Sequence, residues 1–236
     1  MEVYVGTSGW SYSWNPDGFA WYSTRSGLNA IELNMSFYSF PRLRMIYSWA
    51  KKTRGNIRWA IKVNRIITHV YRLSEKSYAI WHKFQRLFKP LEDYIDFYLF
   101  QMPPSFRPSQ NNLEKIEKMF YEVNLGEKFA LEIRDPAWIS EEYLKAFKKL
   151  GLTFVSVDAP EFKWFVETNG IVYLRVHGRT SWYSHRYTTD ELVELADEVL
   201  KLNPRKVYVF FNNNHDMLDN GREMLEILKR KTNIRP

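Results

Sequence analysis

The chain has 236 residues with 34 basic and 27 acidic side chains, which gives a formal net charge of +7. It has no cysteine, which excludes disulfides, thiolate metal sites and a cysteine nucleophile. No run of about 18 apolar residues is present, so the sequence predicts no membrane-spanning helix. A strand-like start without a preceding signal peptide predicts a cytoplasmic protein, and the length fits one domain over residues 1–236.

Short runs rich in Val, Ile, Phe and Tyr recur along the chain and predict strands. The eight expected strands cover 3–7, 30–34, 58–63, 96–101, 129–134, 153–158, 171–177 and 206–212. Apolar residues at helical spacing predict helices over 114–123, 141–150, 190–200 and 220–229. Thr189 is the expected N-cap of the third helix. The first crossover, 14–29, is short and contains two glycines, so we expect an abbreviated helix there.

Strands that alternate with helices predict an α/β fold, and eight of them in this length favour a TIM (β/α)₈ barrel. The alternative is an open doubly wound sheet. No phosphate-binding G-x-G-x-x-G follows the first strand, which favours the barrel.

Polar residues alternate with apolar ones toward the carboxyl end of most predicted strands. Because side chains alternate along a strand, the apolar residues face the helices and the polar residues face the lumen. At the carboxyl ends of the strands these polar residues lie at the mouth where barrel active sites are found. These residues are Glu32, Asn34, Lys62, Glu132, Arg134, Asp158, Arg175, His177 and Asn212. Buried charges are costly unless paired, so a structural network such as Glu132 with Arg175 is one interpretation. The clustering of so many titratable groups favours a functional site.

Loops at the same end supply further candidates. Aromatic residues suited to stacking on sugars or nucleobases are Trp10, Tyr12, Trp138, Trp182 and Tyr183, and the alternative is that they roof the barrel. The remaining binding candidates are Tyr38, His69, Gln101, Arg179 and Asn213. His69 is equally well explained as a loop cap, and His177 as an interior histidine satisfied by Asp158 or Glu132.

The segment 41–90 is strongly basic, with 13 Lys or Arg and one acid, Glu75. It also contains Tyr47, Trp49, Trp59, Tyr71, Tyr78 and Trp81. Basic charge interleaved with aromatic residues is typical of polyanion binding, nucleic acid in particular. The alternative is a solvated outer surface of a heat-adapted protein, but such a surface mixes both signs of charge.

The chain resembles the DUF72 family, the YecE-like proteins of unknown function, along nearly its whole length. The first matching motifs are G-T-S-G-W-S-Y at 6–12, I-E-L-N-M-S-F-Y at 31–38 with Pro41, and I-T-H at 67–69. They continue with F-Q-M-P-P-S-F at 100–106, E-I-R-D-P-A-W at 132–138, Asp158 with Pro160, Y-L-R-V-H-G-R at 173–179 and F-N-N at 211–213. The resemblance implies a TIM barrel and this set of residues, but no reaction.

Two departures from the family pattern concern the mouth. The first crossover is shorter and lacks the family's F-Y-P motif, which predicts a more open mouth on that side. Asn214 follows F-N-N where the family tends to have Asp, so an acidic role at that position is in doubt. The family is similar in fold to the endonuclease IV and xylose isomerase group, an analogy that carries little functional weight.

Three functions compete. The first is a hydrolase or processing enzyme that acts on a phosphate-bearing substrate, either nucleic acid or a nucleotide. The residues expected to bind the phosphate are Lys62, Arg134, Arg175 and Arg179. The residues expected to act as catalytic groups, or as ligands of Mg²⁺, Mn²⁺ or Zn²⁺, are Glu32, Glu132, Asp158 and His177. The second is a metal-free carbohydrate enzyme using Glu32 and Glu132, an idea that fails if each is held by an arginine. The third is a non-catalytic barrel that binds an anion or nucleotide.

Overall fold

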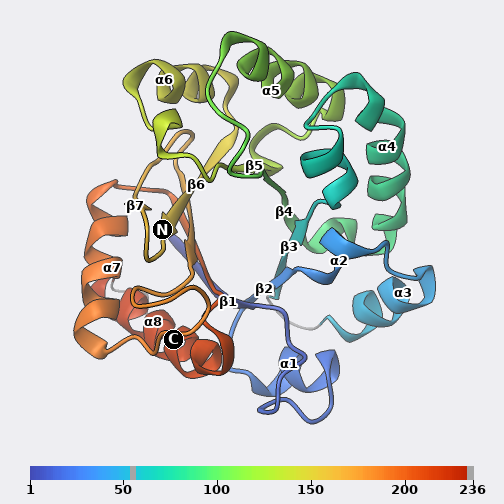
Figure 1. The fold of residues 1–236 in the computed structure, drawn as a ribbon. Helices are drawn as coiled ribbons and strands as arrows, with labels where there is room; N and C mark the ends of the chain where they lie inside the picture. The colour runs from blue at the N-terminus through green and yellow to red at the C-terminus, as the bar shows by residue number, and fades with distance from the viewer. Residues whose placement is uncertain (54–56, 233–236) are drawn as a thin grey trace.

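The computed structural model describes residues 1–53 and 57–232, and within them eight parallel strands close into a barrel surrounded by helices (Figure 1). The strands of the barrel are β1 (Glu2–Ser8), β2 (Ala30–Leu33), β3 (Arg58–Lys62), β4 (Ile95–Gln101), β5 (Phe129–Glu132), β6 (Thr153–Asp158), β8 (Ile171–Val176) and β9 (Lys206–Phe211). Pairing of β5 with β6 completes the ring. The predicted TIM barrel is therefore confirmed. Arg54, counted in the basic segment, lies outside the described residues.

The helical layer follows the sequence pattern closely. Its helices are α1 (Phe19–Arg25), α2 (Met35–Tyr38), α3 (Leu43–Lys52), α4 (Tyr78–Leu87), α5 (Gln110–Val123), α6 (Glu141–Leu150), α7 (Thr189–Lys201) and α8 (Met217–Lys231). The first crossover holds the expected short helix, α1. The N-cap of α7 is Thr188 and not Thr189, because Thr188 and Glu191 form a capping box. None of the helices in the described residues is long and apolar enough to cross a membrane.

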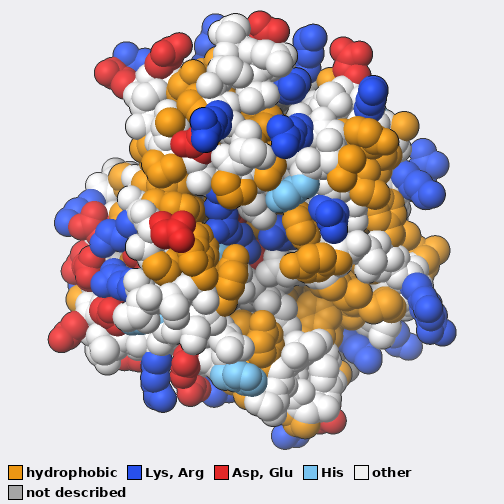
Figure 2. Space-filling view, in the orientation of Figure 1, with side chains coloured by type: hydrophobic (Ala, Val, Ile, Leu, Met, Phe, Trp, Pro, Cys, Tyr) orange, Lys and Arg blue, Asp and Glu red, His pale blue; other side chains and the backbone are white. Residues whose placement is uncertain are grey.

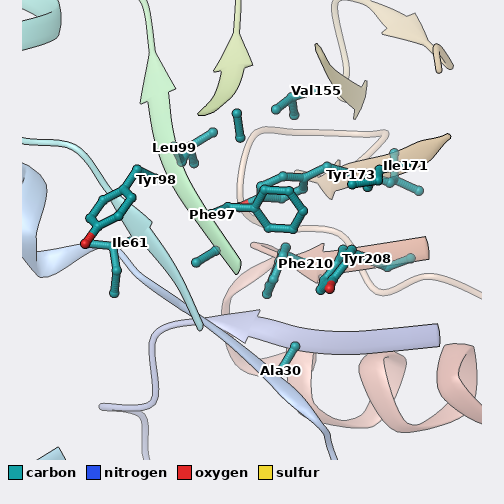
Figure 3. Close-up of a cluster of buried hydrophobic side chains, with 14 of the residues drawn as sticks. Ala30, Ile61, Phe97, Tyr98, Leu99, Val155, Ile171, Tyr173, Tyr208 and Phe210 are labelled. Atoms are coloured by element: carbon teal, nitrogen blue, oxygen red, sulfur yellow. The ribbon is translucent and has the colours of Figure 1, made fainter. Parts of the chain in front are cut away.

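The lower lumen is filled by aromatic side chains. Phe97 packs against Tyr173 and Tyr208 with ring centroids 5.0 and 4.7 Å apart, and Tyr173 packs on Phe210 at 4.9 Å (Figure 3). Residues paired across parallel strands point to the same face, and Tyr208 is paired with Tyr173. This packed plug forms a floor beneath the polar side chains of the carboxyl-terminal mouth.

The orientation of β6 differs from the prediction. Val155 pairs with Tyr173 and Val157 with Arg175, so these two valines face the lumen while Ser156 and Asp158 face outward. The reason lies in the segment 159–170, which includes the two-residue strand β7 (Lys163–Trp164) antiparallel to β6. That segment covers the outer face and supplies hydrogen bonds to polar groups there. Because both faces of β6 are buried, a polar residue on this strand does not indicate which face points into the lumen.

Gly6 on β1 is placed where no larger residue fits. A Cβ at Gly6 would lie 2.3 Å from the backbone oxygen of Ala30 on the paired strand. We expect Gly6→Ala to push β1 from β2 and lower the free energy of unfolding by about 3 kcal/mol, measured by urea denaturation. Gly221→Ala on α8 is the control, because its Cβ would meet Leu28 at an ordinary 3.4 Å. Equal stability of the two variants would contradict this account.

Candidate active site

Arg175 on β8 binds the two carboxylates at the top of the lumen. Its Nε and Nη2 donate to Glu32 Oε2 and Oε1 at 2.9 and 2.7 Å, and its Nη1 donates to Glu132 Oε2 at 2.5 Å. Glu32 also accepts from the hydroxyls of Ser8 and Tyr173, both at 2.7 Å. Arg175, Glu32 and Glu132 are all buried. The network that spacing indicated for Glu132 and Arg175 therefore extends to Glu32.

Arg134 extends this network toward the opening. Its Nε lies 2.5 Å from Glu132 Oε1, and its guanidinium lies 4.8 Å from the centroid of the Trp182 ring. Nη2 is 3.3 Å from His177 Nε2. Trp182 therefore covers Arg134 as part of the roof, and it also donates through Nε1 to Glu161 at 3.1 Å.

The two glutamates are held in their ionised form. Burial would raise the pKa of Glu32, but the charge and hydrogen bonds of Arg175 outweigh it and hold that pKa below its usual range. The pKa of Glu132 is lowered in the same way against burial, by Arg134 and Arg175. Neither carboxyl can act as a protonated general acid at neutral pH. This arrangement removes support from the pair as the acid and nucleophile of a carbohydrate enzyme.

His177 is buried beside the cationic side chains of Arg134 and Arg175, and no carboxylate forms a hydrogen bond with its ring among the described residues. Burial, followed by the charges of Arg175 and Arg134, lowers its pKa well below the usual value, so the imidazole is neutral. Its Nδ1 lies 3.3 Å from Asn212 Nδ2, while Nε2 is 3.9 Å from Glu132 Oε1. Asp158 contacts its backbone amide instead of its ring. The interpretation of His177 as satisfied by Asp158 is therefore wrong.

Lys62 is the cationic side chain that this network leaves without a carboxylate partner. It ends β3, and its Nζ lies 4.3 Å from the centroid of the Phe37 ring. Within residues 1–53 and 57–232 its amine has no hydrogen bond or ion pair, whereas Arg175 and Arg134 are both paired. Burial, and then the charge of Arg175, lower the pKa of Lys62 to about 7.

A cleft of about 440 Å³ opens above Lys62. Its lining consists of Ser8, Tyr12, Asn34, Tyr38, Lys62, Tyr183, Asn212 and Asn214. A space-filling view shows the hollow over the barrel centre with basic side chains inside it (Figure 2). The side-chain oxygen of Asn34 is buried and has no hydrogen-bond partner among the described residues. The cleft thus combines one amine, several amides and hydroxyls, and three tyrosine rings.

Asp158 and Arg179 belong to a separate cluster outside the lumen, which corrects their predicted place at the mouth. Asp158 Oδ2 accepts from Tyr187 at 2.6 Å and lies 3.3 Å from Arg179 Nε. Arg179 also donates to Glu194 at 2.8 Å. Burial raises the pKa of Asp158 against the effect of Tyr187. These residues fasten the loop after β8 to α7, and Asp158 is too enclosed by them to meet a ligand in the cleft.

Several predicted wall residues are core residues. Trp138 is fully buried and donates to the backbone oxygen of Phe106 at 2.8 Å, so it does not reach the mouth. Trp10 packs its ring against Trp49 and Trp59, which leaves it 8% exposed at the edge of a smaller adjoining pocket. A hydrophobic ring beside a strand end gains more by burial in the helical layer than by standing in a polar cleft.

The smaller polar candidates divide in the same way. Gln101 donates to the backbone oxygen of Met102 at 2.6 Å, and Asn213 donates to His185 and Asn220, so both stabilise loops. His69 lies near the opening, bonded to Thr68 at 2.9 Å and packed on Phe37, which also contacts Lys62. Burial, and then the charge of Lys62, lower the pKa of His69 to about 4.

The aromatic residues of the basic segment differ in exposure. Trp49, Trp59 and Trp81 are buried in the core, Tyr71 and Tyr78 are partly buried, and Tyr47 is 59% exposed. Arg58 pairs with Asp96 at the amino-terminal end of the barrel, far along β3 from Lys62 at its other end. The three tryptophans are therefore not available to stack on a ligand, and polyanion binding by this segment stays a prediction.

Sequence reasoning missed several residues of the site. Tyr173 shares the inward face of β8 with Arg175 and follows the same period of two, so that signal was present. Ser8 pairs with Glu32 in the register of β1 and β2, which the sequence alone does not reveal. Phe37 on α2 lies within the motif at 31–38, but nothing in its spacing indicated a contact with Lys62. The described residues bring together no group of three or more His, Asp and Glu side chains able to hold a metal ion.

The fold and the polar mouth define a TIM-barrel protein whose candidate site lies at the carboxyl ends of its strands. The family model described as "Protein of unknown function DUF72" matches residues 4–235, and the chain belongs to the DUF72 family. It is 26% identical to the UPF0759 protein YunF of Bacillus subtilis (strain 168), over 84% of this chain and 82% of that protein.

Two solved DUF72 family structures share the fold. The protein from Thermotoga maritima MSB8 is 28% identical with a TM-score of 0.82, and the match covers 99% of each chain. The protein from Enterococcus faecalis V583 is 21% identical with a TM-score of 0.81, over 96% of this chain and 95% of that one. These likenesses define the family and the barrel, and they name no reaction.

Replacement of Arg175 by Met is expected to destabilise the protein by about 3–5 kcal/mol at neutral pH, because buried Glu32 loses its ion-pair partner and Glu132 keeps only Arg134. In the wild type the lowered pKa values of the two glutamates stabilise the folded protein at pH values above their usual pKa of 4.5. This stabilisation is lost as the pH falls from 4.5 through the lowered pKa values of the folded state. In the variant burial raises the pKa of Glu32, so the deficit shrinks as the pH falls toward about 4.5.

Urea denaturation over a pH series measures this deficit. Lys145→Met is the control, because it breaks an exposed pair with Glu141 that is worth less than about 1 kcal/mol. A loss for Arg175→Met no larger than the loss for the control would contradict the central role of the network. If Arg175→Met does not fold at neutral pH, combining it with Glu32→Gln and Glu132→Gln should restore folding.

Replacement of Lys62 by Met is expected to stabilise the protein below pH 7, by on the order of 2–4 kcal/mol. The lysine pKa falls from 10.5 to about 7 on folding, so folding at lower pH must bury a charge or release a proton. The wild type gains stability as the pH rises from 7 toward 10.5, and the advantage of the variant shrinks over that window. Unfolding midpoints at several pH values, with the exposed Lys83→Met as the control, measure this. A less stable Lys62→Met at low pH would contradict it.

Proposed function

We propose that the barrel mouth is the active site of an enzyme that binds and processes a small phosphate-bearing substrate of nucleotide size. The observation that carries this proposal is the unpaired amine of Lys62 inside the cleft. Every other cation of the inner network is already matched to a carboxylate. An incoming anionic group therefore finds its counter-charge at Lys62.

The charge balance supports an anionic ligand. Lys62, Arg134 and Arg175 are three cations when Lys62 is protonated, against the two carboxylates Glu32 and Glu132. The site therefore has an excess of one positive charge when Lys62 is protonated. A phosphate monoester removes that excess and raises the pKa of Lys62, so binding is coupled to proton uptake.

The size and lining of the cleft support a ligand larger than phosphate alone. Its volume of about 440 Å³ lies within the range of small-molecule sites, on the order of 300–1,000 Å³. The rings of Tyr12, Tyr38 and Tyr183 offer stacking surfaces for a base or a sugar, and Asn34 and Asn212 offer amide groups. An end or flipped nucleotide of a nucleic acid would use the same groups.

Titration calorimetry with sulfate and with AMP tests the proposal. We expect both to bind, with AMP the tighter ligand, and Lys62→Met to weaken both at least about tenfold, the equivalent of one charge-assisted hydrogen bond. Sulfate keeps its charge over this range, so its affinity should fall as the pH rises through the Lys62 pKa of about 7. Lys83→Met, on the exposed face of α4, should bind like the wild type.

The competing outcomes separate the alternatives. Absence of sulfate and AMP binding would overturn the proposal. Binding of a short single-stranded DNA without AMP binding, with an affinity that falls steeply with salt, would assign the ligand to nucleic acid and the basic segment instead. Binding of AMP with equal affinity by wild type and Lys62→Met would remove Lys62 from the site.

A further inference from the structure

We propose that Lys62 is a catalytic residue whose amine forms an imine with an aldehyde or ketone that also carries a phosphate or carboxylate group. This inference rests on the proposed function, because the anionic group of the substrate occupies the same cleft. It adds a reaction class to the site and assigns Lys62 a covalent role in addition to binding.

The position of Lys62 meets the geometric needs of such a nucleophile. Its Nζ stands against the face of Phe37 at 4.3 Å and reaches the cleft, and no carboxylate in the described residues holds it. Arg175 and Arg134 use Glu32 and Glu132 fully, so these acids do not hold Lys62 as an ion pair. A lysine placed on an apolar ring and beside other cations is the usual arrangement of an imine-forming amine.

The protonation state agrees with this position. The pKa of Lys62 is lowered to about 7, whereas the pKa values of Lys89 and Lys201 are raised by their exposed glutamate partners. Near pH 7 about half of the Lys62 amines carry a free lone pair, compared with about one in a few thousand for an ordinary lysine. The reactive form is thus populated without a separate base.

The charges around Lys62 indicate which carbonyl compounds fit. With Lys62 neutral, Arg134 and Arg175 balance Glu32 and Glu132. A protonated imine adds one positive charge to this enclosed site, which is costly unless a counter-charge comes with the substrate. A phosphate or carboxylate on the substrate supplies it, and a neutral carbonyl compound does not.

Atoms and electrons balance in the step. The amine lone pair forms the new C–N bond, the carbonyl C–O bond breaks, and the oxygen leaves as water with the two protons of the amine. The imine nitrogen then takes a proton from solvent to become the charged form, so no oxidant or reductant is needed. Tyr12 and Tyr183 line the same cleft as Lys62.

Reductive trapping tests the inference. The full chain is treated with pyridoxal 5′-phosphate, or with pyridoxal as the analogue without phosphate, and sodium borohydride then fixes any imine for peptide mass spectrometry. At about pH 7 we expect Lys62 to be labelled at least about tenfold faster than exposed Lys83. Pyridoxal should label Lys62 more slowly than its phosphate ester. Lys62→Arg should bind sulfate without being labelled at this position.

Each result bears on a different claim. Sulfate binding together with labelling of Lys62 no faster than labelling of Lys83 would overturn the imine while the anion site stands. Absence of sulfate binding, with pyridoxal and its phosphate ester labelling Lys62 equally fast, would overturn the anion site and with it the anionic class of carbonyl substrate. Comparison of Lys62 with Lys83 within the wild type keeps the test decisive even if Lys62→Arg does not fold.

Discussion

The contact of Arg175 with two buried glutamates is the constraint on which the upper barrel depends. Three charges in a packed lumen are tolerated because each guanidinium nitrogen has a carboxylate oxygen and because Ser8 and Tyr173 satisfy what remains of Glu32. The glutamates come from β2 and β5, on different sides of the ring, and Arg175 comes from β8. One side chain therefore ties three sectors of the barrel together at the level of the candidate site.

The same contact determines which groups remain for chemistry. Glu32 and Glu132 are committed acceptors, and Arg134 is drawn to Glu132 and covered by Trp182. Burial, together with the charges of the nearby arginines, lowers the pKa values of His177 and Lys62, so near pH 7 the imidazole is neutral and about half of the Lys62 amines are unprotonated. A mouth with so many charged residues in its sequence thus presents one amine and a ring of amides, hydroxyls and tyrosines.

Much of this arrangement could be predicted from the sequence. The period of two on β2, β3, β5 and β8 correctly placed Glu32, Lys62, Glu132 and Arg175 on the inner face, since the outer face of those strands is apolar. It was wrong for Asp158 because 159–170 folds over the outside of β6. Which carboxylate pairs with which arginine could not be predicted, because the pairing depends on strand register and on which side chains reach across the lumen. The burial of Trp10 and Trp138 likewise depends on the direction of each ring.

The outer cluster of Asp158, Tyr187 and Arg179 has a consequence for the wall of the cleft. Tyr187 bridges Asp158 and the amide of Gly178, Asn220 accepts from the amide of Tyr187, and the amide of Tyr183 bonds back to His177. The loop that carries Trp182 and Tyr183 is therefore ordered during folding. The conformational entropy needed to order this wall is therefore lost during folding and not when a ligand binds. Even a small molecule with few contacts meets a wall that is already ordered. Adaptation to ligands of different size is left to the opposite rim, where Tyr38 stands exposed at the end of α2.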